Sequence, residues 1–398
     1  MGQKRVVAVF TGNRAEYGLQ FPILRAISRH PDLSYQLMVS GAHLDRNFGA
    51  TLEEIKKDGF EIHSEVAIDM DADTLYATAQ AIGSGVLSIS KALDRLKPDI
   101  FVVYADRFEG FAAMIAGTQM RIPTAHIEGG DVTQGGALDD SVRHAMTKLA
   151  HLHFTTNENA ANRIRVMGEE PWRVFNVGFP AIDLIADGIY ASKEDLVARY
   201  NLDLSKPLVV FTQHSVTTQF EDAARQLEGP LQAMEILAWE GVQVILTYPN
   251  NDAGGRRIAT ELERFMGKGV PNVQLHKSLG RSNYHGLLNI CGRGPAGGAC
   301  VGNSSSGIKE TPAFGCPTVD IGSRQEGRLA GENVIKTGYG RDEVLAAVRK
   351  CLNDKGFIKR CHEGHNPYGV GDAGKKIADV LARISLDGRL ITKQMTIP

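Results

Sequence analysis

The sequence predicts an α/β protein made of two similar halves, each a parallel sheet with helices on both faces. Short apolar runs alternate with helix-like segments along the chain. The 43 glycines gather where an apolar run meets such a segment, as recurring strand-to-helix turns require. The length of 398 residues suits two domains of the usual ~100 to 200 residues.

The elements of the first half follow a repeated β-then-α order. Six runs rich in Val, Ile, Leu, Phe and Tyr predict strands: 5–10, 35–39, 100–104, 123–127, 152–155 and 174–177. Three segments have the length and composition of crossover helices: 18–29, 107–119 and 140–150. This order is typical of a parallel sheet.

The second half repeats the plan. The pattern loosens into a polar stretch around 191–203, and a new apolar strand begins at 208 after Lys206-Pro207. Strands are predicted at 208–211, 242–247, 273–275, 299–301 and 318–321. We therefore place the domains at 1–190 and 191–398, and we expect the last helix to pack back on the first domain.

Composition and charge exclude several classes of protein. Hydrophobic residues make up 43% and charged residues 23%, so the chain is neither disordered nor fibrous. The formal net charge of −2 provides no overall field for binding nucleic acid or an anionic membrane. Apolar runs are far shorter than the ~18 residues of a membrane span, and no signal core precedes them. The five cysteines include no C-x-x-C pair, which suits a cytoplasmic location and disfavours structural zinc.

Polar residues follow the predicted strands, and in a parallel sheet ligands bind beyond these carboxyl ends. The residues are Thr11 to Arg14, Asp106-Arg107, Glu128 to Gly130 and Thr212 to His214. Each alone could be a turn or a helix cap. Together they predict a site.

The strongest local signal is the segment from Gly302 to Gly307, which contains Asn303, Ser304, Ser305 and Ser306. A helix is predicted at 308–314 directly after it. Small residues, hydroxyls and the N–H groups of a helix start favour an anion, so the loop is interpreted as a phosphate cradle. A serine-capped helix is the alternative. Glu310 could accept both hydroxyls of a ribose or could equally pair with the dipole of a helix N-terminus. Arg14, Arg324 and Arg328 are suited to a pyrophosphate, and a surface ion pair is the alternative for each.

Carboxylates form a second candidate cluster in the first half: Asp106, Glu128, Asp131, Asp139 and Asp140. Carboxylates brought together raise one another's pKa, which can supply both an acid and a base near neutral pH. A divalent metal is the competing interpretation. Because Asp139 and Asp140 are adjacent on a helix, they cannot easily face one ion, and no metal site is expected. Two histidine groups, His151 with His153 and Cys361 with His362 and His365, are interpreted as packing rather than ligands.

A nicotinamide dinucleotide site is not expected. The turn from Gly12 to Gly18 lacks the G-x-G-x-x-G spacing, and the next strand ends in Ser40-Gly41-Ala42-His43 rather than in an acidic residue.

These motifs together resemble the hydrolysing sugar-nucleotide 2-epimerases, typified by UDP-N-acetylglucosamine 2-epimerase of sialic acid biosynthesis. The resemblance spans nearly the whole chain. It rests on segments 11–18, 40–44, 126–130, 139–144, 302–307, 309–310 and 322–328. It implies two Rossmann-like domains facing a cleft, in a glycosyltransferase-B-like arrangement.

The resemblance also implies a reaction: UDP leaves C1 of the sugar as the C2 proton is removed, and water adds to the resulting glycal. The products are a free N-acetylmannosamine-type sugar and UDP, and no cofactor takes part. The catalytic positions it implies are Asp106, Glu128, Asp139, Asp140 and His214, with the C2 base unassigned. The substrate-binding positions are Arg14, Arg143, Asn303, Ser304, Ser305, Ser306, Gly307, Glu310, Arg324, Gln325 and Arg328. We also expect a homo-oligomer, a dimer or tetramer.

Two departures from the family pattern stand out. Ala105 precedes Asp106 where the family usually has glycine, and the glycine-rich segment 291–300 looks longer than usual. The sugar is open between UDP-N-acetylglucosamine and the 2,4-diacetamido-trideoxy sugar nucleotide of legionaminic acid biosynthesis, and GDP is an alternative nucleotide. A glycosyltransferase and a sugar-nucleotide-binding regulator are alternative functions.

Overall fold

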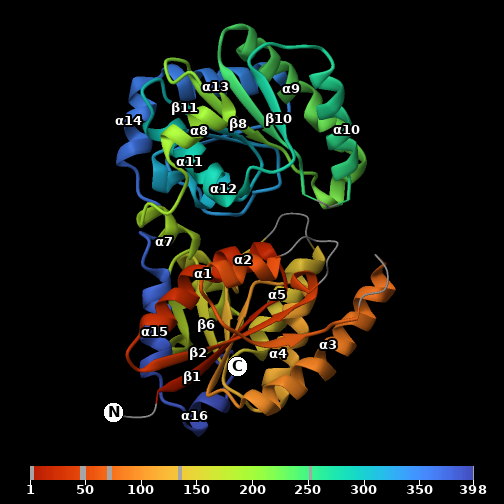
Figure 1. Cartoon of the computed structure of the whole chain (residues 1–398), viewed down its shortest axis with the longest axis vertical. Coiled ribbons are helices and arrows are strands. Elements are labelled where there is room, and N and C mark those ends of the chain that lie inside the picture. The colour runs from red at the N-terminus through yellow and green to blue at the C-terminus, as the bar shows by residue number, and fades with distance from the viewer. Residues whose placement is uncertain (1–3, 45–50, 70–73, 133–136, 251–252, 398) are drawn as a thin grey trace. The chain divides into compact units, whose positions relative to one another are not determined.

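The computed structural model describes residues 4–44, 51–69, 74–132, 137–250 and 253–397 (Figure 1). The chain divides into two compact units. Unit 1 comprises Met1–Asp131, Leu138–Asp183 and Gly369–Pro398, and unit 2 comprises Val132–Ala137 and Leu184–Tyr368. The boundary predicted between 190 and 191 thus lies inside unit 2, because Ile185 and Tyr190 already pack in the core of that unit.

Unit 1 is a seven-stranded parallel sheet with strand order β3-β2-β1-β4-β5-β6-β7. Its strands are β1 Arg5–Thr11, β2 Leu33–Ser40, β3 Ile62–Val66, β4 Ile100–Tyr104, β5 Thr124–Ile127, β6 Leu152–Thr155 and β7 Val174–Asn176. Its helices are α1 Arg14–Arg29, α2 Thr51–Lys57, α3 Leu75–Leu96, α4 Phe108–Gln119, α5 Ala137–Leu149, α6 Glu158–Val166, α15 Ala373–Arg383 and α16 Gly388–Ile391. Helix α7 Ala181–Ala186 contains the change from unit 1 to unit 2, between Asp183 and Leu184. The 3-10 turns η1 Gly41–His43 and η3 Pro171–Arg173 complete the unit.

Side-chain alternation along β1 builds a separate core on each face of this sheet. Val7 and Val9 pack in one cluster with α1 and α15. Ala8 and Phe10 pack in the other with α3, α4 and α5. All four are at most 1% exposed, which explains why the strand is an unbroken apolar run.

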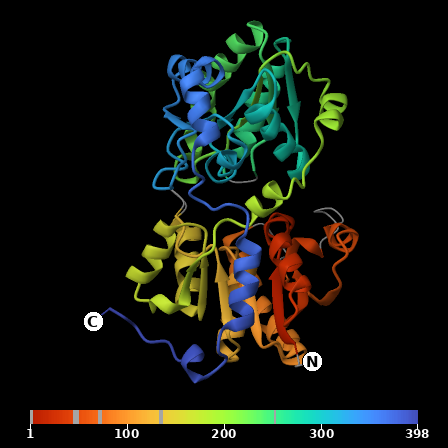
Figure 2. The ribbon, with the colours of Figure 1, turned by 90° about the vertical axis from the view of Figure 1, so that its left-hand side faces the viewer.

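The C-terminal segment belongs to unit 1. Helix α15 contacts α1, and Figure 2 shows the blue α15 beside the red α1. The carboxylate of Asp183 accepts hydrogen bonds from the backbone N–H groups of Ala373 (3.0 Å) and Gly374 (2.7 Å) at the start of α15. These bonds satisfy donors that the first helical turn leaves unpaired.

Unit 2 is a six-stranded parallel sheet with order β10-β9-β8-β11-β12-β13. Its strands are β8 Leu208–Thr212, β9 Gln243–Thr247, β10 Val273–His276, β11 Gly298–Gly302, β12 Thr318–Ile321 and β13 Val334–Thr337. Its helices are α8 Lys193–Tyr200, α9 Ala223–Trp239, α10 Gly255–Met266, α11 Gly280–Arg293, α12 Ser306–Lys309, α13 Arg341–Asn353 and α14 Lys355–Glu363, with the 3-10 segments η4 Thr217–Asp222 and η5 Thr311–Phe314.

Both units have the Rossmann strand order, in which the first strand lies centrally and the order reverses beside it. Alternation again separates two cores in unit 2. Val209 and Phe211 pack in one cluster with α9 and α13, and Leu208 and Val210 pack in the other with α8 and α11. The predicted α/β class with two Rossmann-like halves is confirmed.

Two strands escaped prediction, β3 and β13, and each lies at the edge of its sheet. Their sequences, IHSEV and VIKT, mix polar with apolar residues because an edge strand is only partly covered. Within the described residues, every helix is too short or too polar to span a lipid bilayer.

Candidate active site

Asp106 and Glu128 leave neighbouring strands of unit 1 at the same edge of the sheet. Asp106 follows the end of β4, and Glu128 directly follows β5. Ala105 and Glu128 have the left-handed φ angles +55° and +67°, so the chain turns sharply off the sheet after each of these two strands. The N–H of Ala105 donates to the Ile127 carbonyl (3.0 Å), and the N–H of Glu128 donates to the Phe154 carbonyl (2.9 Å). Both turns are therefore anchored to the next strand.

Arg143 of α5 connects the carboxylates of this cluster. Its guanidinium group is 5% exposed, pairs with Asp106 and Asp140, and donates to the Asp131 carbonyl at 3.1 Å. Burial raises the pKa of Asp106, and the charge of Arg143 opposes that rise. Arg143, predicted to contact substrate, thus lies in the structure as the bridge between Asp106 and Asp140.

The adjacent residues Asp139 and Asp140 have different surroundings. Asp140 pairs with Arg143 across one helical turn, whereas Asp139 is exposed. The charge of Asp139 also contributes to the raised pKa of Asp106, so it lies near that carboxylate.

His126 of β5 holds the turn that carries Asp106. Its Nε2 lies 2.6 Å from the Ala105 carbonyl oxygen, and burial lowers the pKa of His126 to about 3. The ring is therefore neutral at neutral pH, with Nε2 as the donor. The sequence placed His126 inside the predicted strand 123–127 but gave it no role, because nothing in the pattern shows a bond to a backbone carbonyl.

A second group of titratable side chains lies at the end of β1. Asn13 caps α1 by accepting from the N–H of Glu16, and the N–H of Gly12 donates to Glu16 Oε2 at 2.9 Å. Burial and the charge of Glu109 raise the pKa of Glu16 to about 8, and burial raises that of Glu109. Burial lowers the pKa of His43 to about 4, and its Nε2 lies 3.0 Å from Thr11 Oγ1. The side chain of Arg14 lies outside the described residues.

In unit 2, Asn303 clasps the backbone of His214. The N–H of His214 donates to Asn303 Oδ1 (2.7 Å), and Asn303 Nδ2 donates to the His214 carbonyl (2.8 Å). Asn303 is fully buried. Its side chain positions His214, and the predicted contact of Asn303 with the ligand stays a prediction.

The ring of His214 is held as well. Its Nδ1 accepts from the N–H of Asn250 at 3.0 Å, so Nε2 carries the proton of the neutral ring. Burial and the nearby charge of Arg324 lower the pKa of His214 to about 3. At neutral pH His214 is therefore a neutral hydrogen-bond donor.

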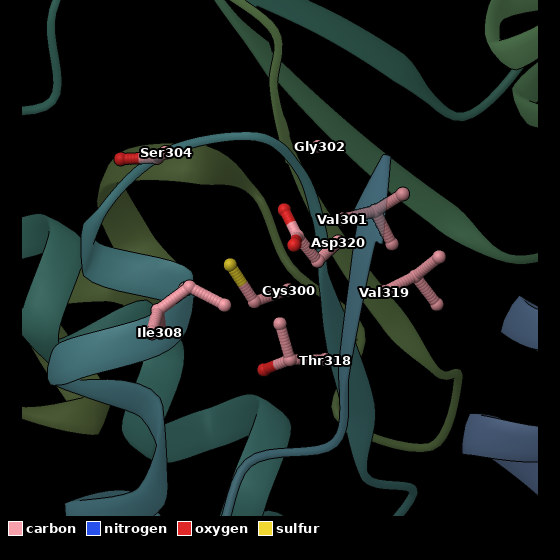
Figure 3. A pocket seen from close by; sticks show the side chains of 9 residues that line it. Cys300, Val301, Gly302, Ser304, Ile308, Thr318, Val319 and Asp320 are labelled. Carbon is pink, nitrogen blue, oxygen red and sulfur yellow. The ribbon is translucent and has the colours of Figure 1, made fainter. Parts of the chain in front are cut away.

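The segment 302–307, called the serine loop below, starts at Gly302, where no side chain fits. Its φ is +128°, and an added Cβ would lie 1.9 Å from the Thr212 carbonyl oxygen. Figure 3 shows Cys300, Thr318 and Asp320 pointing to one side of β11 and β12, and Val301 and Val319 pointing to the other. Ser304 lies apart at the loop. The space lined by these residues has no room for a water molecule, so a ligand would bind outside it.

The helix predicted at 308–314 is not continuous. Helix α12 covers only Ser306–Lys309, and η5 follows at Thr311–Phe314. Pro312 has no N–H to continue an α-helix. The predicted dipole of a long helix is therefore absent at this loop. Glu310 lies between the two short helices, as the C-cap of α12 and the N-cap of η5. The loop can offer hydroxyls and backbone N–H groups.

Glu310 is held by two donors. His285 Nε2 lies 2.8 Å from Glu310 Oε2, and Ser306 Oγ donates to the same oxygen at 2.8 Å. Burial alone would raise the pKa of Glu310, but the contacts with His285, Ser306 and Lys309 together outweigh it and hold the pKa below its ordinary value.

Segment 322–328 closes the loop from the other side. The Asn303 carbonyl accepts from Arg324 Nη1 (3.3 Å) and Gln325 Nε2 (2.8 Å). Gln325 Oε1 accepts from Arg328 Nη1 (2.7 Å), so the buried amide of Gln325 is bonded at both ends to protein. Arg328 Nε also donates to the Val132 carbonyl at 2.9 Å. Gln325 holds the loop through these bonds, and its predicted contact with the substrate stays a prediction.

Within the described part of the chain, no three His, Cys, Asp or Glu side chains gather as they would around a metal ion. His151 Nδ1 lies 2.9 Å from Thr124 Oγ1, and His153 Nε2 lies 3.1 Å from Glu169 Oε2. His362 Nε2 lies 2.7 Å from the Gly292 carbonyl oxygen.

The glycine-rich segment around Gly294 leads from α11 into the start of β11, at the opposite end of that strand from the serine loop.

Comparison with known proteins identifies the family to which the chain belongs. The family model described as UDP-N-acetylglucosamine 2-epimerase matches residues 25–382. The chain belongs to the UDP-N-acetylglucosamine 2-epimerase family. A UDP-N,N'-diacetylbacillosamine 2-epimerase (hydrolyzing) of Legionella pneumophila is 32% identical to this epimerase-family chain over 98% of each chain. A GDP/UDP-N,N'-diacetylbacillosamine 2-epimerase (hydrolyzing) of Campylobacter jejuni is 34% identical over 83% of this chain and 84% of that protein.

Solved structures of epimerases share the fold. The UDP-GlcNAc 2-epimerase of Neisseria meningitidis, solved bound to UDP-GlcNAc, has a TM-score of 0.78 and 18% identity, and the match covers 96% of this chain and 100% of that one. This likeness confirms the predicted glycosyltransferase-B-like fold class. The epimerase-family resemblance that the motifs carried is likewise confirmed by the family match.

Proposed function

We propose that this chain is a hydrolysing 2-epimerase that converts a UDP-2-acetamido sugar into the free C2-inverted sugar and UDP. A carboxylate of unit 1 removes the C2 proton while the C1–O bond to UDP breaks, and the C2–H electron pair forms the C1=C2 bond of a glycal. Water then adds its oxygen to C1, and a proton is delivered to the other face of C2. Each bond broken is matched by one formed, and no redox cofactor is needed.

The observation that carries the proposal is the placement of Asp106 and Glu128 on neighbouring strand ends, in a family of 2-epimerases. The raised pKa of Asp106 suits a group that exchanges a proton, because proton transfer is most efficient when the pKa approaches the working pH. Asp139 and Asp140 supply further carboxylates nearby. We propose that His214 donates a hydrogen bond from Nε2 to the departing UDP or to the intermediate.

We propose that unit 2 binds the nucleotide part of the substrate. The hydroxyls of Ser304 and Ser305 offer donors to phosphate oxygens, Glu310 offers an acceptor to the ribose, and Arg324 and Arg328 bring positive charge. The Ser306 hydroxyl and the Gly307 N–H are bonded inside the protein, to Glu310 Oε2 and to the Ser304 carbonyl, and support the loop. Arg14 is proposed to contact the pyrophosphate from unit 1.

Incubation with UDP-N-acetylglucosamine and no acceptor tests this reaction. We expect ¹H NMR to show UDP and free N-acetylmannosamine. Release of UDP with free N-acetylglucosamine would indicate a hydrolase, and a requirement for an acceptor would indicate a glycosyltransferase. Either result would overturn the proposal.

A second substrate is favoured by a specific observation, since the Legionella and Campylobacter relatives above 30% identity are both named for diacetylbacillosamine. The ratio of kcat/KM for UDP-N,N'-diacetylbacillosamine and UDP-N-acetylglucosamine, measured on one preparation, decides between the two sugars. A ratio above ~100 in either direction identifies the substrate.

A further inference from the structure

His285 of α11 is a buried histidine that the motifs did not single out. Its side chain is 2% exposed, and its Nε2 lies 2.8 Å from Glu310 Oε2. An ionised carboxylate only accepts hydrogen bonds, so the imidazole proton sits on Nε2 and points at Glu310.

The other ring nitrogen, Nδ1, shows that packing in the core does not by itself explain a histidine at position 285. Nδ1 is buried and has no hydrogen-bond partner among the described residues. The ring lies 5.8 Å from Phe314 and 6.4 Å from Tyr284, between centroids, so its surroundings would accept an aromatic hydrocarbon side chain. An unpaired buried polar atom is costly, which points to the Glu310 contact as the reason for a histidine here.

His285 and Ser306 together leave Glu310 one available oxygen. Both donors bond Oε2, and no described residue bonds Oε1. Two donors on one oxygen, from α11 and α12, restrict rotation of the carboxylate group. Oε1 is thereby held in one direction, and its lone pairs can accept two neighbouring hydroxyls of one ligand.

We propose that His285 is a positioning residue that orients Glu310 to accept the 2′- and 3′-hydroxyls of the substrate's ribose, and so selects ribonucleotides over 2′-deoxyribonucleotides. The inference rests on the proposed function only in assigning the nucleotide to unit 2. A ligand lacking the 2′-hydroxyl leaves the oriented carboxylate partly unpaired, which is the penalty that discriminates.

Isothermal titration of UDP and 2′-deoxy-UDP into the full chain tests the proposal. In the wild type we expect UDP to bind about tenfold more tightly than 2′-deoxy-UDP, the effect of one charge-assisted hydrogen bond. His285→Phe should weaken UDP binding about tenfold and bring this preference close to one. His285→Gln retains an N–H donor and should recover most of both. His276→Phe is the matched control, since His276 bonds only the Gln274 side chain in unit 2.

The double variant shows whether His285 acts through Glu310. In a Glu310→Ala background, His285→Phe should have no further effect on UDP affinity, since the group it orients is gone. Additive losses, or an unchanged preference for UDP in folded His285→Phe, would overturn the proposal. Circular dichroism and Tm identify a misfolded variant, and His285→Gln then carries the comparison. Because titration needs no turnover, a chain that shows this coupling but forms no epimerised sugar disproves the proposed function alone.

Discussion

Backbone strain accompanies the candidate chemistry at two turns of unit 1. Ala105 and Glu128 are both non-glycine residues in the left-handed region, and each begins the turn after its strand. His126 and the next strands hold these turns in place, as the bonds to the Ala105 carbonyl and from the Glu128 N–H show. The strain of a turn is thus balanced by bonds that a sequence pattern does not reveal.

Ala105→Gly should leave stability unchanged or raise it slightly. The left-handed conformation costs alanine ~1 to 2 kcal/mol, whereas glycine adds ~0.4 to 1 kcal/mol of unfolded-state entropy. Ala346→Gly is the matched control, because Ala346 is exposed within α13 and should lose about 1 kcal/mol. Urea unfolding measures both. A loss at Ala105 as large as that at Ala346 would show that the turn is not strained.

The buried carboxyl of Glu16 predicts a pH-dependent stability. Its pKa rises from 4.5 in the unfolded chain to about 8 in the folded one, so between these values the folded state holds a proton that the unfolded state has released. Stability from this group is fully present below pH 4.5 and is lost as the pH rises toward 8. The slope is at most ~1.4 kcal/mol per pH unit.

Glu16→Gln should remove this slope, because the amide stays neutral and its oxygen can still accept from Gly12. We expect the free energy of unfolding at pH 8 to exceed that of the wild type, with little difference at pH 4.5. Glu53→Gln, at an exposed position, should leave the slope unchanged. Parallel pH profiles for Glu16→Gln and the wild type would mean that Glu16 is ionised in the folded chain.

His214→Ala should reduce kcat by about 10²- to 10⁴-fold with an unchanged circular dichroism spectrum. His214→Gln keeps a side-chain N–H donor, so it should retain more activity if His214 acts as a neutral donor. With its pKa lowered to about 3, His214 itself should add no limb near pH 6.5 to the wild-type rate profile. A folded His214→Ala variant with near-normal kcat would remove the residue from the mechanism.

At the scale of elements, predictability followed burial. Central strands β4 and β6 have the predicted bounds, and every residue of both strands is buried. All five residues of β4 are hydrophobic, whereas in β6 Leu152 and Phe154 alternate with His153 and Thr155. Edge strands β3 and β13 lack that signal. Long helix α3 was also missed, since no turn motif of the predicted site adjoins it. The segment 308–314 has helical composition, but Pro312 divides it into α12 and η5.

The residues of the candidate site were likewise predictable only in part. Residue types at strand ends predicted where polar groups gather, but not which way each side chain points. Asn303 and Gln325 have the same polar chemistry as ligand-binding residues, yet each amide is bonded within the protein. His285 lies in the middle of a helix with no motif around it, and only its contact with Glu310 identifies it.

The serine loop yields a prediction that separates binding from chemistry. Ser305→Ala removes a hydroxyl from the proposed phosphate site, so UDP affinity should fall about threefold to tenfold while kcat changes less. Ser205→Ala, an exposed serine of unit 2 bonded to Asp203, is the control. Calorimetry with UDP and steady-state kinetics provide the two readouts. Unchanged UDP affinity with a collapsed kcat would reverse the roles proposed for the two clusters.

For the whole molecule, the two units contribute different halves of one proposed reaction. The carboxylates, held by Arg143, belong to unit 1, and the serine loop with Glu310 belongs to unit 2. The C-terminal segment returns to unit 1, where α15 contacts α1 and Asp183 caps the start of α15. A single chain thus presents the proposed proton-transfer groups on one Rossmann-like sheet and the proposed nucleotide-binding groups on another.

The origin of one hydrogen atom tests this division of labour. If a carboxylate of unit 1 removes the C2 proton and a solvent-derived proton is added to the other face, turnover in D₂O must place deuterium at C2 of the inverted product. A glycosyltransferase or simple sugar-nucleotide hydrolase breaks only the C1–O bond, so its product keeps the original hydrogen and configuration at C2.

Variants assign the two halves of that reaction. Asp106→Asn and Glu128→Gln should lower the rate of deuterium incorporation by about 10²-fold or more while UDP affinity stays within about threefold, because neither carboxylate is proposed to contact the nucleotide. Glu310→Ala should do the reverse at saturating substrate: weaker UDP binding, with every product molecule still inverted and labelled. NMR of the released sugar reports label and configuration together. Protonated, uninverted sugar from the wild type would contradict the 2-epimerase mechanism even if UDP were released rapidly.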